Sequence, residues 1–535
     1  MLNRRDSRFS FPSQGWPLLA LIALYLGAGL FGHDPWKADD ATAIGVAWDM
    51  LTRGHWLAPH VGNLPYPDVP LYYWSAAGFG NLFSPFFPVH DGMRLASAFW
   101  TGMALFCLWH AGRELVGSDA GLCTVLAFAG SIGLVEHAHG AQPMLTGLAA
   151  HAAAYWALAL LPRRPWKSAL LLGLALAVAF LGSGLAVSLL LLPPLILALT
   201  LEREKRRAAL ALIAGLLLGV ALILPWCFWL FYAEPDYFAQ WWAKSTAQFG
   251  ETRSFFNTAA AYLGMLSWFS WPAWPLAAWV LWIRRRTLLS RVYALPLGSF
   301  FLVWLFLSCT HEARPFLALL LLPPLAILAG PAVAVLRRGA ANAFDWFGVM
   351  TFSFFSMLVW IGWSALVFGL PERLARQSVK LAPGFAAAFN GFDFAIAVLA
   401  TVAWVALFLS SRPSPARGLM HWLAGMTTFW LLLTALWLPW VDYQKTYRGV
   451  SSLLATAWPA SSGCLDTRSL SSSHLASFDY FDGILTTPGK SCDWLLTFGS
   501  SGVDEAAPGA GWTLIGEAHR PSDRSERFRL YRREP

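Results

Sequence analysis

Long apolar segments, separated by short polar loops, make up most of the 535-residue chain. A helix needs roughly 20 apolar residues to cross the hydrocarbon core of a bilayer, and about thirteen segments come close to that length. Their extents are 16–32, 93–111, 118–135, 143–161, 168–182, 185–201, 208–232, 257–283, 292–309, 315–336, 345–369, 393–410 and 418–440. The pattern predicts a mainly α, polytopic membrane protein with about thirteen transmembrane helices.

Basic residues occur in every second loop between these segments. They are Arg113; Arg163, Arg164 and Lys167; Arg203, Lys205, Arg206 and Arg207; Arg284, Arg285 and Arg286; Arg337 and Arg338; and Arg412 and Arg417. Because cytoplasmic loops are rich in Lys and Arg, this alternation predicts a cytoplasmic N-terminus. It also predicts that everything after residue 440 lies outside, which in a bacterium is the periplasm. The first apolar segment lacks a small-residue cleavage site, so we expect a retained helix rather than a signal peptide.

The first outer loop, residues 33–90, concentrates acids that the rest of the chain avoids. Asp39 and Asp40 lie just past the first apolar segment, where a helix would leave the bilayer. From Ala41 to Leu51, apolar residues recur at spacings of three and four, which predicts an amphipathic helix lying along the membrane interface. Residues 71–87 form a second aromatic, interfacial segment. We predict that the loop and residues 1–440 around it form one membrane domain with a site at its outer surface.

The composition changes after residue 440, where Ser, Asp, Thr and Gly replace the apolar segments. Residues 494–498, 512–517 and 528–532 look like short strands, and residues 469–478 look like a helix. Residues 441–535 are therefore predicted to form a small α/β periplasmic domain. It contains Cys464 and Cys492, which we expect to form a disulfide in an oxidising compartment.

Composition narrows the functional classes. With 57% hydrophobic and 13% charged residues, the chain is a membrane protein. The formal charge of +8 does not indicate nucleic-acid binding, because the basic residues lie in short clusters between apolar segments. A transporter would favour ionisable residues within the spans, whereas here they lie almost entirely in the loops.

One ordered set of residues in the first outer loop resembles a known family. The acidic pair is followed by an amphipathic helix ending in Met50 and Leu51. The remaining residues of the set are Gly54, Trp56, Pro59, Gly62, Pro70, Leu71, Tyr73 and Trp74. This order and spacing resemble the first external loop of the GT-C glycosyltransferases, in particular the bacterial aminoarabinose (lipid A) transferases and the protein O-mannosyltransferases.

The resemblance implies an integral membrane glycosyltransferase of the bacterial inner membrane. Such an enzyme moves a hexose or pentose from a polyprenyl-phosphate donor to a periplasmic acceptor, which can be a lipid A-type lipid, another glycan or a protein. It needs a base or charge partner for the acceptor and cations for the phosphate leaving group. The pattern makes no cofactor certain, and a divalent metal is possible. The alternatives are a catalytically impaired relative that binds polyprenyl lipids and, from another class, a transporter.

The family's catalytic acid matches Asp39 and Asp40. The alternative interpretation is that these acids only cap the following helix. The chain departs from the family at three places. Asp68 replaces a common lysine, Gln142 replaces an acid, and 182–184 (Gly-Ser-Gly) replaces a Lys-Gly pair. The phosphate site must therefore use other residues, or the activity is altered or lost.

Several outer-loop residues are candidates for that site or for a metal. The predicted substrate-binding residues are Lys37, Tyr66, Asp68, Gln142, Lys244, Arg253, His311 and Arg314. The alternative interpretation of Arg314 is that it lies at a helix end and only extends its side chain to the membrane interface. Glu136, His137 and His139 are candidate ligands of a divalent metal, since imidazole and carboxylate suit zinc or manganese; solvated loop residues are the alternative.

Overall fold

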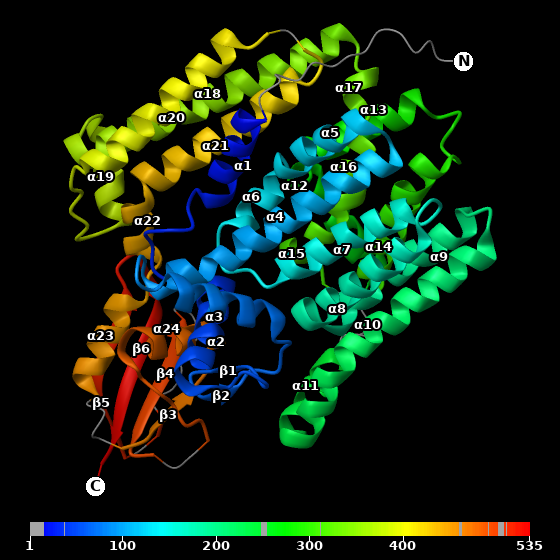
Figure 1. The fold of residues 1–535 in the computed structure, drawn as a ribbon. Coiled ribbons are helices and arrows are strands. Elements are labelled where there is room, and N and C mark those ends of the chain that lie inside the picture. Colours follow the sequence, from blue (N-terminus) through cyan, green and yellow to red (C-terminus); the bar gives the residue numbers. More distant parts are fainter. Residues whose placement is uncertain are drawn as a thin grey trace.

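The structure is a computed structural model that describes residues 15–36, 38–247, 254–310, 312–412, 414–458, 463–489, 492–500, 508–509 and 511–534. Most of the described chain is helical (Figure 1). The helices of the membrane part are α1 (Trp16–Gly27), α4 (Val89–Leu115), α5 (Ser118–Ala129), α6 (Ile132–Ala138), α7 (Met144–Leu160), α8 (Pro165–Leu189), α9 (Leu192–Leu201), α10 (Lys205–Ala233), α11 (Pro235–Ala247), α12 (Phe255–Phe269), α13 (Ala273–Ile283), α14 (Arg291–Thr310), α15 (Pro315–Ala318), η1 (Leu319–Leu321), α16 (Leu322–Ala329), α17 (Ala332–Val335), α18 (Arg338–Phe368), α19 (Glu372–Leu381), α20 (Gly391–Ser410), α21 (Arg417–Leu436) and α22 (Leu438–Lys445).

The predicted polytopic, mainly helical architecture is confirmed. Within the described residues, seven helices are long and apolar enough to cross a membrane, and α5 with α6 forms an eighth candidate bent by 68°. Four further apolar helices, α1, α7, α9 and α13, are shorter. The boundary expected between the segments 168–182 and 185–201 coincides with a kink within α8 at Gly184. Gly184 has φ of +87°, which a residue with a side chain rarely adopts, so glycine allows the bend.

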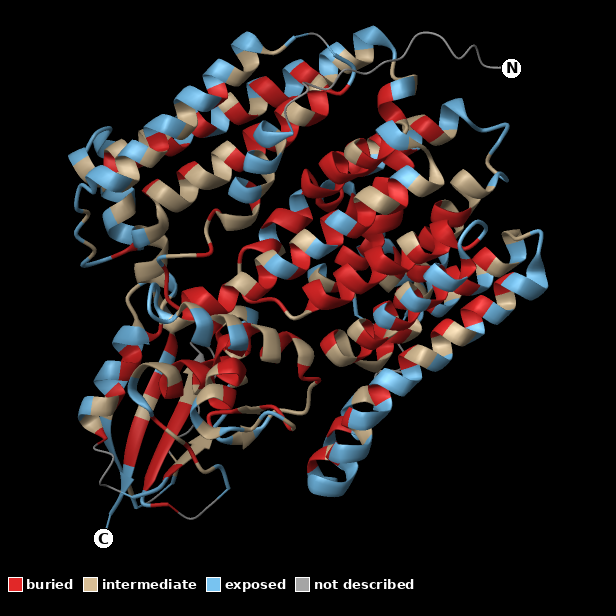
Figure 2. Cartoon of the chain, viewed as in Figure 1, coloured by how far each residue is buried: buried red, intermediate tan, exposed pale blue. Residues whose placement is uncertain are grey.

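Burial distinguishes an inner bundle from an outer layer. The helices α5, α7 and α16 are mostly buried, whereas α10, α18 and α20 expose one long side (Figure 2). That exposed side is apolar: Leu217, Leu224 and Phe228 of α10 are each more than half exposed. Large exposed apolar side chains on several adjoining helices are what a lipid-facing surface requires. The chain is a multi-pass membrane protein.

Residues after 440 end in a four-stranded sheet. Its strands are β3 (Leu465–Arg468), β4 (Trp494–Ser500), β5 (Trp512–Arg520) and β6 (Asp523–Arg533), in the order β3-β4-β6-β5. β3 pairs with β4 in parallel through a crossover containing α24 (Ser472–Asp482), and the other pairs are antiparallel. The helix α23 (Arg448–Ala457) packs beside α24. β3 was not predicted, because four residues give too short a pattern to recognise.

The first outer loop contains two helices and a hairpin. They are α2 (Asp39–Arg53), the strands β1 (His60–Val61) and β2 (Leu64–Pro65), and α3 (Leu71–Phe83). We predicted that the apolar face of α2 lies in the membrane interface. The structure corrects this, because that face is buried against α3 and α24 (Figure 1). Gly45 makes the approach of α24 possible, since a Cβ there would lie 2.4 Å from Cβ of Ala476.

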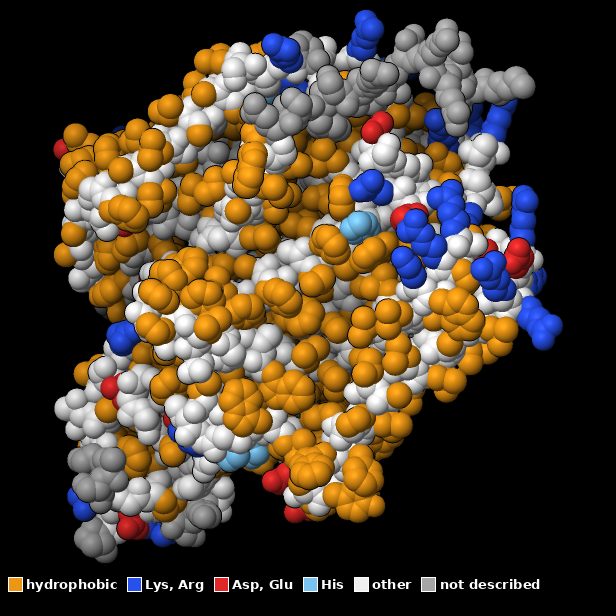
Figure 3. Space-filling model, in the orientation of Figure 1, with side chains coloured by type: hydrophobic (Ala, Val, Ile, Leu, Met, Phe, Trp, Pro, Cys, Tyr) orange, Lys and Arg blue, Asp and Glu red, His pale blue; other side chains and the backbone are white. Residues whose placement is uncertain are grey.

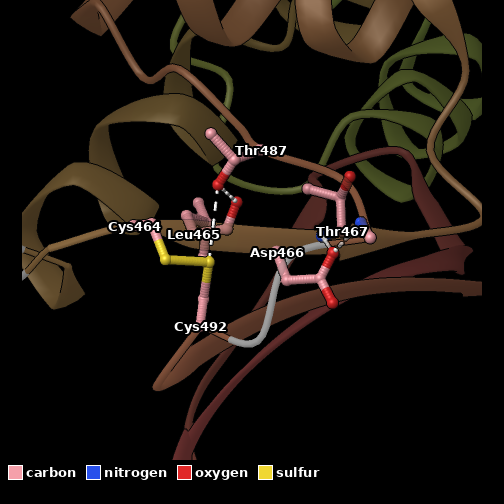
Figure 4. Close-up of a disulfide and its surroundings, with 7 residues drawn as sticks. Cys464, Leu465, Asp466, Thr467, Thr487 and Cys492 are labelled. Atoms are coloured by element: carbon pink, nitrogen blue, oxygen red, sulfur yellow. Dashed lines mark hydrogen bonds between the residues drawn. A yellow bond between two sulfur atoms is a disulfide. The ribbon is translucent and has the colours of Figure 1, made fainter.

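A disulfide joins Cys464 and Cys492, with their Cα atoms 5.4 Å apart (Figure 4). It connects the residue before β3 to the segment before β4. Asp466 lies beside it and accepts hydrogen bonds from the backbone N–H groups of Thr467 and Gly489. The disulfide therefore reinforces the parallel β3–β4 pair at its start.

Candidate active site

The two adjacent acids at the start of α2 face different surroundings. The N-cap residue of α2 is Ala38, and the helix begins at Asp39. Neither acid therefore occupies the capping position. Side chains of successive helix residues point about 100° apart, which follows from 3.6 residues per turn. Asp39 consequently faces a cavity, while Asp40 turns into the protein.

Asp40 is enclosed by hydrogen-bond donors. Arg94 donates from Nε and Nη2 to its two carboxylate oxygens, at 3.0 and 2.9 Å. The backbone N–H groups of Trp36 and Ala141 donate to it at 3.0 and 2.7 Å. Burial raises the pKa of Asp40, but the charge and hydrogen bonds of Arg94 outweigh burial and lower the pKa to about 2. Asp40 is therefore a fixed anion with both oxygens engaged.

Arg94 is a functional residue that the sequence pattern did not reveal. It lies in the first two turns of α4 and is fully buried. Besides Asp40, its guanidinium binds the carboxylate of Asp91 and the backbone carbonyls of His33 and Asp34, each at 2.9 Å. Arg94 thereby ties the end of the α1–α2 connection and the start of α2 to α4. The only signal in the sequence was a lone arginine at the edge of an apolar segment.

Asp39 lines a cavity of about 180 Å³. The amide of Gln142 donates to its Oδ2 at 3.0 Å, and Gln142 Oε1 accepts from the backbone N–H of Met144 at 3.3 Å. The second contact fixes the amide so that its NH₂ group points at Asp39. The cavity is also lined by Thr42, Ala43, Tyr66, Asp68, Tyr73, Pro143, Met144, Gly182, Ser183 and Phe316. Four predicted site residues, Asp39, Tyr66, Asp68 and Gln142, are thus brought together.

A larger cavity of about 430 Å³ adjoins the first. The two share Asp68, Met144, Ser183 and Phe316 as lining residues. The larger one is also lined by Lys244 of α11 and by Arg314, which precedes α15. Lys244 donates to the carbonyl of Pro67 at 2.8 Å, and the Arg314 side chain is 57% exposed. Two cations that the sequence predicted as phosphate ligands therefore lie beside the acidic cavity.

Asp68 separates the acidic cavity from the cavity that contains the two cations. Its carboxylate accepts from the hydroxyl of Tyr73 at 2.9 Å and from the backbone N–H of Val69 at 2.8 Å. Tyr237 of α11 donates to the carbonyl of Tyr66 at 2.6 Å and so holds the preceding segment. Burial is the main cause that raises the pKa values of Tyr66 and Tyr73, so both hydroxyls stay protonated donors.

The kink of α8 forms one wall of both cavities. The hydroxyl of Ser183 lies 2.9 Å from the hydroxyl of Thr146 and accepts from the backbone N–H of Gly147 at 2.9 Å. A Cβ at Gly182 would lie 2.3 Å from Oγ1 of Thr146. This close packing leaves no room at Gly182 for a larger side chain.

The remaining candidates are not brought into this site by the described part of the chain. Lys37, Arg253 and His311 lie outside the described residues. Both ring nitrogens of His139 contact backbone carbonyls, those of Val135 and Tyr25, so no nitrogen is available to a metal. Among the described residues, the group of potential ligands within 4.8 Å of one another is Asp49, His55 and His60, and not the predicted 136–139 segment. The metal prediction for Glu136, His137 and His139 is therefore not supported.

Comparison with solved structures first gives the class of the fold. The crystal structure of ArnT from Cupriavidus metallidurans bound to undecaprenyl phosphate matches with a TM-score of 0.67, covering 97% of this chain and 98% of that one at 16% identity. The apo oligosaccharyltransferase of Archaeoglobus fulgidus matches with a TM-score of 0.50 at 10% identity. The fold is that of ArnT, and the resemblance to GT-C glycosyltransferases is confirmed.

Sequence relatives narrow the class. The model of the dolichyl-phosphate-mannose-protein mannosyltransferase family matches residues 65–229. The undecaprenyl phosphate-α-4-amino-4-deoxy-L-arabinose arabinosyl transferase of Serratia proteamaculans is 30% identical over 44% of each chain. The enzyme of that name from Pseudomonas savastanoi pv. phaseolicola is 27% identical over 78% of this chain and 75% of its own. The chain matches less than half the length of the first two relatives, at 44% and 42%.

Proposed function

We propose that this protein is a membrane glycosyltransferase that moves a sugar from an undecaprenyl-phosphate-type donor to a periplasmic acceptor. The first acceptor to test is a lipid A-type lipid. The observation that carries the proposal is the pair of adjoining cavities. One contains the carboxylates of Asp39 and Asp68. The other is lined by the cations Lys244 and Arg314 together with Asp68 and Glu312, whose carboxylate lies 3.6 Å from Arg314. A carboxylate in one cavity and cations in the next fit a reaction in which a base meets an acceptor and cations stabilise a departing phosphate.

In the proposed reaction, each of these side chains acts on one of the bonds that form or break. An oxygen of the acceptor attacks the anomeric carbon of the donor sugar, and the bond from that carbon to the phosphate oxygen breaks. Asp39 takes the proton of an acceptor hydroxyl, or orients an acceptor that carries no proton, and Gln142 holds the carboxylate in place. The phosphate leaves with the bonding electron pair, and Arg314 and Lys244 stabilise its charge. Asp40 acts as a positioning residue through Arg94.

The negative charge of the smaller cavity favours binding of a sugar that carries a positive charge. Asp39 and Asp68 both line it, and Asp68 stands where the family resemblance implies a lysine. The relatives named above act on a 4-amino-4-deoxy sugar, whose amine is protonated at neutral pH. A carboxylate can bind such an ammonium group through a charge-assisted hydrogen bond. We therefore propose an amino sugar as the first donor to test.

The experiment is a transfer assay with the full chain in proteoliposomes. The donor is undecaprenyl phosphate linked to 4-amino-4-deoxy-arabinose, the acceptor is lipid A, and the product is followed by mass spectrometry. We expect the acceptor to gain the mass of the sugar. A matched donor with a neutral pentose tests the amino-sugar preference. A protein that binds undecaprenyl phosphate and transfers no sugar from either donor would instead be a lipid-binding relative.

Arg314→Ala is expected to weaken donor binding. Losing a hydrogen bond to a charged group costs about 1.5–3 kcal/mol, which corresponds to roughly tenfold or more in affinity at ~1.4 kcal/mol per decade. Binding of undecaprenyl phosphate to the purified variants gives the measurement. Arg376→Ala is the control, because Arg376 is an exposed residue of α19 outside both cavities. Equal affinity of Arg314→Ala and wild type would mean that Arg314 only reaches to the membrane surface.

The proposed topology has about thirteen spans, a cytoplasmic N-terminus and a periplasmic C-terminal domain of residues 441–535. Figure 3 supports it, because Lys and Arg side chains gather at the end of the molecule opposite the C-terminal sheet, with a broad apolar band between. Reporter fusions after Arg286 and after Pro535 should therefore report opposite sides of the bacterial inner membrane. Two fusions that report the same side would contradict this topology.

A further inference from the structure

Two histidines and an aspartate meet where α2 leads into the β1–β2 hairpin, outside both cavities. One potential ligand atom from each of Asp49, His55 and His60 lies within 4.8 Å of the others. The rings of His55 and His60 face each other at 4.2 Å between centroids. Asp49 is fully buried, whereas His55 and His60 are partly exposed, so an ion can reach them from solvent.

The hydrogen bonds of the two rings show which atoms can bind an ion. Nδ1 of His60 lies 2.7 Å from the carbonyl oxygen of Ala58, which can only accept, so Nδ1 carries the proton and Nε2 carries the lone pair. Nδ1 of His55 lies 2.5 Å from Oδ1 of Asp49, so an ion that takes both of these atoms as ligands replaces the proton between them. A second nitrogen held by a backbone carbonyl, as in His60, is typical of metal-binding histidines.

The surrounding charges favour a cation. Arg53 binds Asp49 at 2.8 Å and is also held by Asp479 of α24, at 2.9 Å from Nη1. Two carboxylates therefore face one guanidinium, and one negative charge remains beside the two imidazoles.

We propose that Asp49, His55 and His60 form a binding site for a divalent transition metal ion of the zinc class. Two imidazoles and a carboxylate are a ligand set that suits Zn²⁺, with water completing the coordination. The ion would fix the loop from Gly54 to His60 against α2. Because the hairpin continues directly into Tyr66 and Asp68, a rigid loop there also holds the wall of the acidic cavity.

The test measures zinc itself, without enzyme activity. The full chain, in detergent and freed of any affinity tag, is dialysed against Zn²⁺, and bound metal is measured by mass spectrometry and by calorimetric titration. We expect wild type to bind zinc stoichiometrically and His55→Ala and His60→Ala each to lose more than about tenfold in affinity. Zinc should raise the melting temperature of wild type and have little effect on that of either variant.

His519→Ala is the matched control, because His519 is an exposed histidine of β5 far from this loop in the sequence. It should bind zinc like wild type. Equal melting temperatures of His60→Ala and wild type without metal would show that the variant folds, so its lost affinity reports on the site. Wild type that binds no stoichiometric zinc, or His55→Ala and His60→Ala variants that bind it as tightly as wild type, would overturn the proposal.

Discussion

Asp39→Asn should insert and fold like wild type but lose transfer activity by on the order of 10²-fold or more, the usual loss when a general base is removed. Asn preserves the shape of the side chain and keeps an oxygen that can accept from Gln142. The only property removed is the negative charge that would receive a proton or pair with the acceptor. The measurement is the initial rate of sugar transfer in proteoliposomes, at matched protein content.

Asp40→Asn is the control one residue away. It removes the same charge from the same turn of α2, but from a side chain enclosed by Arg94 and two backbone N–H groups. We expect it to keep a substantial fraction of the transfer rate and to unfold more easily. Wild-type transfer by Asp39→Asn would remove Asp39 as the base and make the lipid-binding alternative the better interpretation.

Arg94→Met is expected to have the largest effect on stability. Removing one partner of a buried ion pair typically costs about 3–5 kcal/mol, because the other charge stays buried without compensation. Here the variant leaves Asp40 without its cation and removes one donor from each of the backbone carbonyls of His33 and Asp34. We expect a markedly lower melting temperature in detergent. Arg314→Ala, at an exposed position, should leave the melting temperature unchanged.

The double variant Arg94→Met with Asp40→Asn separates charge from packing. Asn at 40 keeps an oxygen for one of the two backbone donors, Trp36 or Ala141, but carries no charge, so it should recover part of the stability lost in Arg94→Met. A double variant no more stable than Arg94→Met would mean that the carbonyl contacts of Arg94, and not Asp40, account for the loss. Because the pKa of Asp40 is lowered to about 2, its contribution is complete above its unfolded pKa and is lost only as pH falls toward 2.

The apolar segments could be located from the sequence because length and composition alone define them. The convergence of Asp39, Tyr66, Asp68 and Gln142 on one cavity followed from the family resemblance and not from any local pattern. Spacing along the chain could not place Gln142 beside Asp39, since 103 residues separate them.

The role of Arg94 could not be predicted from the sequence, for a physical reason. An arginine at the edge of an apolar segment usually reaches to the membrane surface, and nothing in its immediate sequence distinguishes an inward-facing guanidinium. One partner, Asp91, is three residues away, but Asp40 and the carbonyls of His33 and Asp34 lie 54 to 61 residues away. The partner of the apolar face of α2 was misjudged for a similar reason. An amphipathic pattern says that a face is covered, but not whether lipid or protein covers it.

That contact between α2 and α24 constrains how the protein can be made. Arg53 and its partner Asp479 are separated by 426 residues. At a synthesis rate of about 5–20 residues per second, α24 is completed roughly 20–85 s after α2. During that interval the buried face of α2 has no partner from its own chain. Either the membrane surface or a chaperone must shield it until α24 has been made, so the final shape of the site depends on the synthesis of α24.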